Sequence, residues 1–392
     1  MIDYFHQADD PYSHLTAQVL APLAARYGVA IRPWLAPPPD DAAAPERERL
    51  RAYGRRDAAR LAARYGLRFP SGVGAPSAEA AALAQRALAA ALGAPDFAAQ
   101  AVAIGDLLWA GDDAALARLP LAAPDATAAA VAAGGAERLR LGHYLGGMLN
   151  YDGQWYWGVD RINHLEERLA GEGRDSQPGA PMLAPYLAMK LGPKPAGARE
   201  ATIEMWFSFR SPYSWIAFPR VVQLARHYGA RLTLRPILPM VMRGLPVPPI
   251  KSFYIVTDTK RQADRARLPF MPISDPVGPG AERALAVVHH VAPLGLGEAF
   301  AESALRGAWT EAIPLADDAG LAKVAERAGV SAAQVAAALA DERWRVAAED
   351  NRAALFDAGL WGAPTYRVNG GPAHWGQDRL WTLEEDLLAA LG

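Results

Sequence analysis

Residues 206–215 read WFSFRSPYSW, where an apolar run ends on a Ser-Pro pair and a new amphipathic pattern begins. Thr202 to Phe207 is rich in residues that favour strands, so we expect a β-strand there. Ser211 suits a helix N-cap, and Pro212 suits the first helical position because it has a fixed φ and no N–H. The apolar stripe that follows predicts a buried helix ending near Tyr228-Gly229. The stretch is therefore expected to form a strand, a turn and the start of a helix.

Ser211 is a candidate functional residue because it would lie among the free backbone N–H groups of a helix N-terminus. An anion or a thiolate is stabilised at such a position by these groups and by the helix dipole. The chain contains no cysteine, so a thiol activated here would have to come from another molecule. From the residue alone, the simpler interpretation is that Ser211 only caps the helix.

Composition limits the classes of protein to consider. A length of 392 residues predicts two domains, and 51% hydrophobic with 21% charged residues is typical of a soluble globular protein. The net charge of -2 gives no reason to expect nucleic acid as a partner. We also expect no membrane span and, since the first residues lack a signal-peptide pattern, a cytoplasmic location. The absence of cysteine excludes disulfides and zinc-thiolate sites, and the eight histidines show no metal-ligand spacing, so no metal is expected.

The chain contains an internal repeat. Pro11-Tyr12-Ser13 and Tyr27-Gly28 recur 201 residues later as Pro212-Tyr213-Ser214 and Tyr228-Gly229. Near the end of each copy the offset is 218, as the following pairs show: Trp157-Gly158 and Trp375-Gly376, Asp160-Arg161 and Asp378-Arg379, Leu165-Glu166-Glu167 and Leu383-Glu384-Glu385. Several matches in one register indicate a duplication. We therefore predict domains at 1–170 and 200–392, joined by a surface linker at 171–199 that is rich in proline and glycine.

Each copy has the same predicted order of elements: strand, helix, strand, a helical middle, a hairpin and a last helix. The helical middles are expected at about 43–133 and 251–358, and the hairpins at Leu149 to Trp157 and Thr365 to Trp375. Asx-Gly pairs mark both hairpin turns. This order predicts an α/β fold class with two tandem thioredoxin-like domains, each with an inserted α-helical subdomain.

The second copy resembles a known family. The resemblance rests on four stretches: Ile203 to Ser214, Lys251-x-x-Tyr254-x-x-x-Asp258-x-x-Arg261, Trp361-Gly362-Ala363-Pro364-Thr365 and Trp375-Gly376-Gln377-Asp378-Arg379. In these it is similar to the 2-hydroxychromene-2-carboxylate isomerases, which are close to the kappa-class glutathione transferases and belong to the DsbA-like thioredoxin group. The likeness covers essentially all of the second copy. The first copy resembles a diverged relative.

The resemblance implies a glutathione site in the second copy. Ser211 matches the serine that hydrogen-bonds the sulfur of glutathione, and Pro364 after Ala363 matches a cis-proline whose preceding backbone pairs with the cysteinyl part. Gln377 and Asp378, expected at the start of the last helix, match the pair that holds the γ-glutamyl end, and Lys251 matches a basic residue near the tripeptide. One residue departs from the family pattern. Leu245 stands where the family often has an asparagine, which removes an expected ligand contact.

The first copy departs further from the pattern. Asp10 stands in place of Ser211, and a carboxylate there would repel a thiolate. The segment that matches Gly362-Ala363-Pro364 is approximately Leu145-Gly146-Gly147, without the proline. We interpret this copy as a structural or interface partner, and we expect the two copies to form an internal pseudo-dimer because single-domain relatives are dimers.

Three functions remain open from the sequence. The first is a glutathione-dependent isomerase or transferase that acts on an aromatic or other electrophilic acid, with the external thiol activated at Ser211. The second is a non-catalytic protein that binds glutathione or a small acid. The third is a cysteine-less structural relative of the disulfide oxidoreductases.

Overall fold

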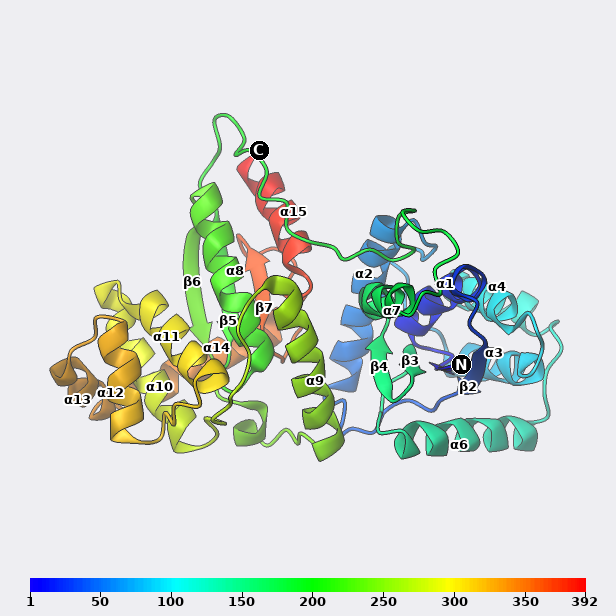
Figure 1. Ribbon diagram of the computed structural model, residues 1–392, viewed down its shortest axis with the longest axis horizontal. Helices are drawn as coiled ribbons and strands as arrows, with labels where there is room; N and C mark the ends of the chain where they lie inside the picture. The colour runs from blue at the N-terminus through cyan, green and yellow to red at the C-terminus, as the bar shows by residue number, and fades with distance from the viewer. The chain divides into compact units, whose positions relative to one another are not determined.

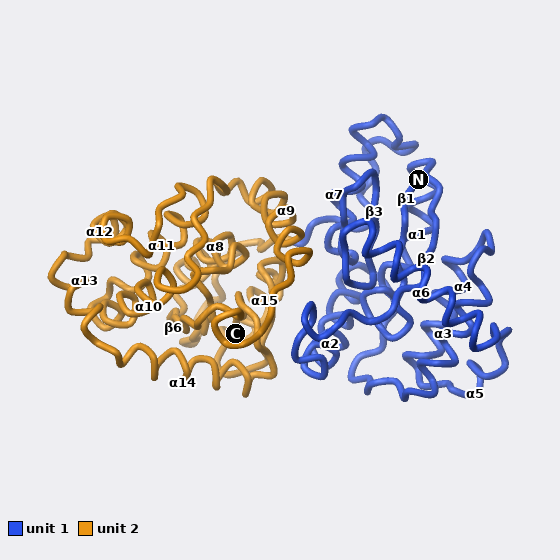
Figure 2. Tube along the Cα trace, turned by 90° about the horizontal axis from the view of Figure 1, so that it is seen from below, with its two compact units in different colours: residues 1–187 blue, residues 188–392 orange.

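The computed structural model describes residues 1–392, which divide into two compact units, residues 1–187 and residues 188–392 (Figure 2). Each unit contains one four-stranded mixed sheet with helices packed around it (Figure 1). None of the helices combines the length with the apolar character that crossing a bilayer would require.

Unit 1 is built on a sheet with the order β2-β1-β3-β4. β1 is parallel to β2 and antiparallel to β3, which pairs with β4 in a hairpin. The strands are β1 (Ile2–His6), β2 (Ile31–Leu35), β3 (Met148–Tyr151) and β4 (Gln154–Trp157). The helices are α1 (Pro11–Tyr27), α2 (Arg47–Tyr65), α3 (Ala78–Ala91), α4 (Phe97–Ala110), α5 (Asp113–Leu116), α6 (Pro124–Arg140) and α7 (Val159–Gly171).

Unit 2 repeats this plan with a sheet of order β6-β5-β7-β8. Its strands are β5 (Thr202–Phe207), β6 (Arg231–Pro236), β7 (Thr365–Val368) and β8 (His374–Trp375). Its α-helices are α8 (Pro212–Tyr228), α9 (Pro249–Ala266), α10 (Pro279–Val291), α11 (Gly297–Thr310), α12 (Asp318–Arg327), α13 (Ala332–Leu339), α14 (Arg343–Asp357) and α15 (Leu380–Leu391). Two 3₁₀ turns complete it, η1 (Met240–Arg243) and η2 (Ala292–Leu294).

Strand register shows that the two sheets are equivalent residue by residue. Phe5 pairs with Met148 in unit 1, and Trp206 pairs with Thr365 in unit 2. Gly147, directly before Met148, therefore occupies the position of Pro364. The expected architecture of two thioredoxin-like domains, each with a helical insertion between its second and third strands, is confirmed.

The strand-turn-helix corner forms as predicted in both units. Ser211 is the N-cap of α8, and Pro212 is its first residue. The helix ends at Tyr228, and Gly229 follows in the left-handed conformation (φ 68°) that glycine adopts without a Cβ clash. Apolar side chains of α8 are fully buried in the core of unit 2, including Ile216, Phe218, Val221 and Leu224.

One helix extends beyond its predicted end. The helical middle of unit 1 was expected to finish near residue 133, but α6 continues through Arg140. Gly134 lies inside this helix, where a Cβ would come within 1.9 Å of the Leu35 carbonyl oxygen. The helix can therefore lie directly on the end of β2 only because this residue has no side chain. In unit 2 the corresponding contact is a hydrogen bond, in which Asn351 Nδ2 of α14 donates to the Pro236 carbonyl oxygen at 3.0 Å.

Candidate functional site

The corner of unit 2 brings together three of the predicted site residues. Ser211 Oγ accepts a hydrogen bond from the Ser214 N–H at 3.1 Å and donates one to the Ala363 carbonyl oxygen at 3.2 Å. The Ala363–Pro364 peptide bond is cis, as the resemblance implied. The Ser211 hydroxyl thus lies at the N-terminus of α8 and next to the backbone that precedes Pro364. A thiolate placed here would meet a hydroxyl donor and the positive end of the helix dipole.

Two tryptophans support the loop that carries Pro364. The rings of Trp361 and Trp375 are 4.9 Å apart, and Trp361 is buried. Gly362 lies so close to them that a Cβ would come within 2.6 Å of Trp375 Nε1. Arg243 Nη2 also donates to the Trp361 carbonyl oxygen at 3.0 Å. These contacts fix the backbone on which any ligand of the corner would depend.

Gln377 and Asp378 lie before the last helix and not at its start, because α15 begins only at Leu380. The Gln377 side chain is 2% exposed. Its Oε1 accepts a hydrogen bond from Arg220 Nη1 at 3.0 Å, and its Nε2 donates to Gln262 Oε1 at 3.3 Å. The amide therefore holds neighbouring elements of the protein together. Asp378 is 15% exposed, and its Oδ1 lies 3.3 Å from Arg379 Nη1.

Lys251 occupies the first turn of α9, where it is half-buried. Burial lowers the pKa of its ammonium group to about 8. Leu245 lies between η1 and α9 and is also half-buried. Helix α9 is joined to the corner by Tyr213, whose hydroxyl donates to the buried Asp258 carboxylate at 2.7 Å. The Pro-Tyr-Ser motif and the aspartate of the helical insertion thus form one contact. Unit 1 has the same contact, in which the Tyr12 hydroxyl donates to Asp57 at 2.9 Å, and Asp57 and Asp258 are 201 residues apart.

The corner of unit 1 already contains a negative charge of its own. Asp10 is the N-cap of α1 and accepts hydrogen bonds from the Ser13 N–H at 2.8 Å and the Ser13 hydroxyl at 2.7 Å. Gly147 stands at the proline position and packs so closely that a Cβ would lie 3.3 Å from Asp10 Oδ2. Burial raises the pKa of Asp10 to about 6. The Asp10 carboxylate takes the place that a thiolate would need.

Three side chains of the unit 2 site were not identified from the sequence: Arg220, Gln262 and Arg243. Gln262 directly follows Arg261, the last residue of the Lys251-to-Arg261 stretch that carries the resemblance, and this position is a weak signal. Arg220 and Arg243 act through backbone and amide oxygens that are distant in the sequence, so no local pattern marks them.

Comparison with known proteins supports the fold of unit 2. The family described as "DSBA-like thioredoxin domain" matches residues 202–388. No curated protein shows a significant match. A solved structure of 2-hydroxychromene-2-carboxylate isomerase is 22% identical, with a TM-score of 0.41, and the match covers 47% of this chain and 93% of that one.

Two further solved structures show the same kind of likeness. A putative protein disulfide isomerase from Nitrosomonas europaea is 15% identical over 50% of this chain and 100% of its own, with a TM-score of 0.40. The cytosolic disulfide reductase DsbM from Pseudomonas aeruginosa, solved with GSH, is 18% identical, and the match covers 48% of this chain and 96% of that one, with a TM-score of 0.37. The DSBA-like thioredoxin domain model thus matches most of unit 2, whose sheet has the order β6-β5-β7-β8.

Proposed function

We propose that unit 2 is a glutathione-dependent isomerase or transferase that acts on an aromatic or other electrophilic acid. One observation carries the proposal. Ser211 places its hydroxyl at the N-terminus of α8, 3.2 Å from the Ala363 carbonyl oxygen beside cis-Pro364, in a chain without cysteine. The corner thus has the groups that stabilise a thiolate but no thiol of its own.

Two charged groups of unit 2 fit a tripeptide that carries both charges. Asp378 suits the ligand's ammonium group, and Lys251 suits a carboxylate when it is protonated. The Gln377 side chain does not fit a direct contact, because its amide is buried between Arg220 and Gln262. We therefore assign Gln377 to positioning the loop before α15.

Glutathione, when bound, would supply the nucleophilic thiol that the chain lacks. Ser211 would turn its hydroxyl hydrogen from the Ala363 carbonyl oxygen to the sulfur, and the N-terminus of α8 would favour the ionised form. The backbone of Ala363 would then pair with the peptide groups of the ligand and orient it. Tyr213 would remain bound to Asp258 and hold the first turn of α8 against α9.

Substitution of Ser211 tests the proposal. If Ser211 donates to a thiolate, Ser211→Ala should lower turnover about 10- to 100-fold, since a charge-assisted hydrogen bond contributes about 1.5–3 kcal/mol. Ser211→Asp should be worse, because a carboxylate facing the sulfur raises the thiol pKa. If Ser211 only caps the helix, Ser211→Ala should cost about 1 kcal/mol of stability, and Ser211→Asp should restore most of it with activity unchanged. An Asp variant as active as the parent would therefore exclude the thiolate role.

A matched control is available in unit 1. Asp10→Ser changes the equivalent N-cap and should leave turnover of the proposed reaction unaltered. The assay is isomerisation of a hydroxychromene carboxylate in the presence of glutathione, with stability followed by thermal unfolding.

A second function, non-catalytic binding of glutathione or a small acid, is favoured by two departures from the family pattern. Leu245 supplies no amide, and the Gln377 amide is used inside the protein. Calorimetric binding of glutathione without turnover of any tested acid would support this alternative over the enzyme.

A further inference from the structure

The segment between the two units is held by a buried carboxylate in unit 1. Glu166 of α7 is fully buried. Its Oε1 accepts the backbone N–H of Leu183 at 2.9 Å, and its Oε2 accepts that of Ala184 at 3.0 Å. Tyr27, the last residue of α1, donates its hydroxyl to Glu166 Oε1 at 3.1 Å. One carboxylate thus receives two successive main-chain N–H groups and one phenol.

Unit 2 contains the same arrangement. Glu384 of α15 is 4% exposed and accepts the N–H groups of Lys190 at 2.5 Å and Leu191 at 2.6 Å. Tyr228, the last residue of α8, donates to Glu384 Oε1 at 2.8 Å. Burial beside this carboxylate raises the pKa of Tyr228 to about 12, so its hydroxyl remains a donor. The glutamates and the tyrosines are equivalent in the repeat, at the offsets of 218 and 201.

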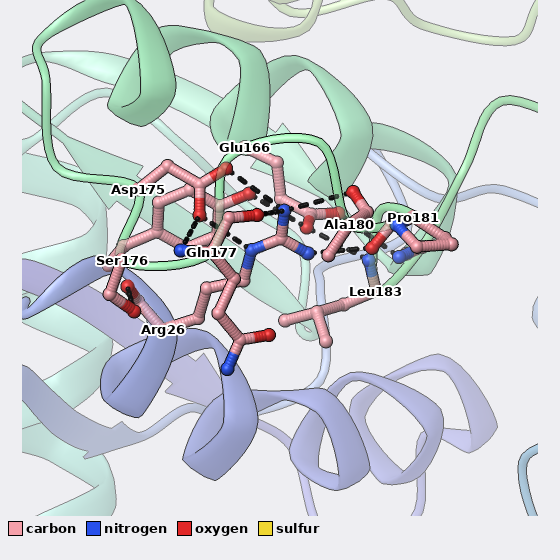
Figure 3. Close-up of polar contacts among 10 residues, drawn as sticks. Arg26, Glu166, Asp175, Ser176, Gln177, Ala180, Pro181 and Leu183 are labelled. Atoms are coloured by element: carbon pink, nitrogen blue, oxygen red, sulfur yellow. Dashed lines mark hydrogen bonds and ion pairs between the residues drawn. The ribbon is translucent and has the colours of Figure 1, made fainter.

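A basic side chain before each tyrosine binds main-chain carbonyl oxygens of the same segment. Arg26 donates to the carbonyl oxygens of Gln177 and Ala180 at 3.2 Å and of Pro181 at 2.6 Å, and pairs with Asp175 at 2.8 and 2.9 Å (Figure 3). His227, the counterpart of Arg26, places Nε2 2.7 Å from the Gly192 carbonyl oxygen. Figure 3 shows the Arg26 guanidinium surrounded by the loop, with Glu166 and Leu183 beside it.

We propose that each unit carries a receptor for extended main chain, and that one segment of this chain occupies both receptors. We name the receptor the clamp (Arg26, Tyr27 and Glu166 in unit 1; His227, Tyr228 and Glu384 in unit 2) and the segment 175–192 the strap. Apart from the Arg26–Asp175 ion pair, the clamp binds main-chain N–H and C=O groups, so it recognises backbone more than side chains. It holds Leu183-Ala184 in one unit and Lys190-Leu191 in the other.

The clamps need an occupant. A buried carboxylate that loses its hydrogen-bond donors is destabilised, because its charge remains desolvated. In unit 1 the occupant follows the last helix, whereas in unit 2 it precedes the first strand. Duplication therefore produced two receptors, and a single strap fills both. The connection between the units is a docked element, with only residues 185–189 between the two clamped pairs.

Amide hydrogen exchange of the full chain tests this proposal. In the parent protein, the amides of residues 183, 184, 190 and 191 should exchange at least 100-fold more slowly than those of an unstructured peptide. Glu166→Gln places an NH₂ group against one of the two N–H donors and should speed exchange at 183–184 about 10-fold or more, without effect at 190–191. Glu384→Gln should do the reverse. The neighbours Glu167→Gln and Glu385→Gln, whose side chains are exposed, are the matched controls.

Trypsin gives a second readout, because the N–H of the Lys190–Leu191 peptide bond is one that Glu384 binds. Glu384→Gln should be cut after Lys190 at least 10-fold faster than the parent, and Glu385→Gln at the parent rate. If the glutamine variants fail to fold, Tyr27→Phe and Tyr228→Phe remove only the phenol donor and should give smaller increases at the same sites. Unprotected amides in the parent, or equal rates in the variants and their controls, would overturn the proposal.

Discussion

Asp10 and Ser211 cap equivalent helices with side chains of different charge. Both accept a hydrogen bond from the N–H group three residues on, so both serve as caps. Only Ser211 leaves the helix N-terminus without a resident negative charge. The two helix N-termini thus differ in charge through a single cap residue.

Asp10 should make unit 1 less stable as the pH rises. Its pKa is raised from 3.8 to about 6 in the folded chain, so the folded state holds the proton more tightly than the unfolded state. Its contribution to stability is therefore present below about pH 4 and is lost as the pH rises to about 6. We expect Asp10→Asn, which keeps the cap, to gain about 1–2 kcal/mol over the parent across this interval.

Urea unfolding at pH 4, 5, 6 and 7 measures the effect of Asp10→Asn. The control is Asp41→Asn, because Asp41 is 80% exposed and should show no such trend. An advantage of Asp10→Asn that is the same at every pH would contradict the expectation.

Lys251 should make ligand binding depend on pH in the alkaline range, if the proposed glutathione site is correct. Because burial lowers its pKa to about 8, its positive charge is present below pH 8 and is lost above it. Lys251→Arg keeps the charge throughout. Affinity for S-methylglutathione, which has no ionisable thiol, should fall roughly 10-fold more for the parent than for Lys251→Arg between pH 7 and 9.5. Parallel calorimetric profiles for the two proteins would remove Lys251 from the site.

The sequence predicted single residues whose roles are local and missed those whose roles depend on partners distant in the sequence. Ser211 was identified as a helix cap from its place before Pro212. The burial of Gln377 was not foreseen, because it depends on Arg220 and Gln262, which are 157 and 115 residues away. No spacing rule connects such residues before the fold is known.

Among the elements, α6 and α14 show two ways of placing a helix on the end of a strand. α14 uses a side-chain hydrogen bond from Asn351, and α6 uses the absence of a side chain at Gly134. Alanine is normally favoured over glycine in a helix by about 1 kcal/mol. Replacing a helical glycine by alanine should therefore stabilise the protein where the new Cβ meets no atom, and destabilise it where the Cβ clashes.

We expect Gly134→Ala to destabilise the protein by more than about 2 kcal/mol, because the new Cβ would overlap the Leu35 carbonyl oxygen. Gly171→Ala, at the end of α7, meets no atom within 4 Å and should instead stabilise by about 0.5 kcal/mol. Thermal unfolding of both variants provides the comparison. A stabilising Gly134→Ala would show that α6 is not held against β2.

Helices and strands, like single residues, could be predicted where the signals that define them lie close together in the sequence. The strand 202–207, the helix from Pro212 to Tyr228 and both hairpins were predicted, because caps, prolines and Asx-Gly turns act over a few residues. The extension of α6 to Arg140 was missed. Gly134 inside this helix packs against the Leu35 backbone of β2, and this contact is distant in the sequence.

For the whole molecule, the difference between the two corners predicts the binding stoichiometry. Unit 1 has Asp10 and Gly147 where unit 2 has Ser211 and Pro364, so we expect one glutathione per chain. Isothermal titration of the full chain should give a stoichiometry of one, and Ser211→Asp should reduce it towards zero. Two equivalent sites would contradict this expectation. The internal pseudo-dimer inferred from the duplication stays a prediction.

The strap could not be predicted, although its receptors left a trace in the sequence. Tyr27, Glu166 and their counterparts appear in the repeat, which marked them as duplicated. Their ligands are backbone groups of residues whose side chains follow no pattern, and the segment therefore has the composition of an ordinary linker. When side chains bind backbone groups, the types of the bound residues do not show where the contact lies.

The strap also limits how such a chain can change during evolution. Linkers between domains normally tolerate insertions and deletions, because few contacts cross them. Here a change of length within 183–184 or 190–191 would remove N–H donors from Glu166 or Glu384, whereas residues 185–189 donate no hydrogen bond to either carboxylate. Between residues 183 and 191, length variation among descendants of this chain should therefore be confined to those five positions.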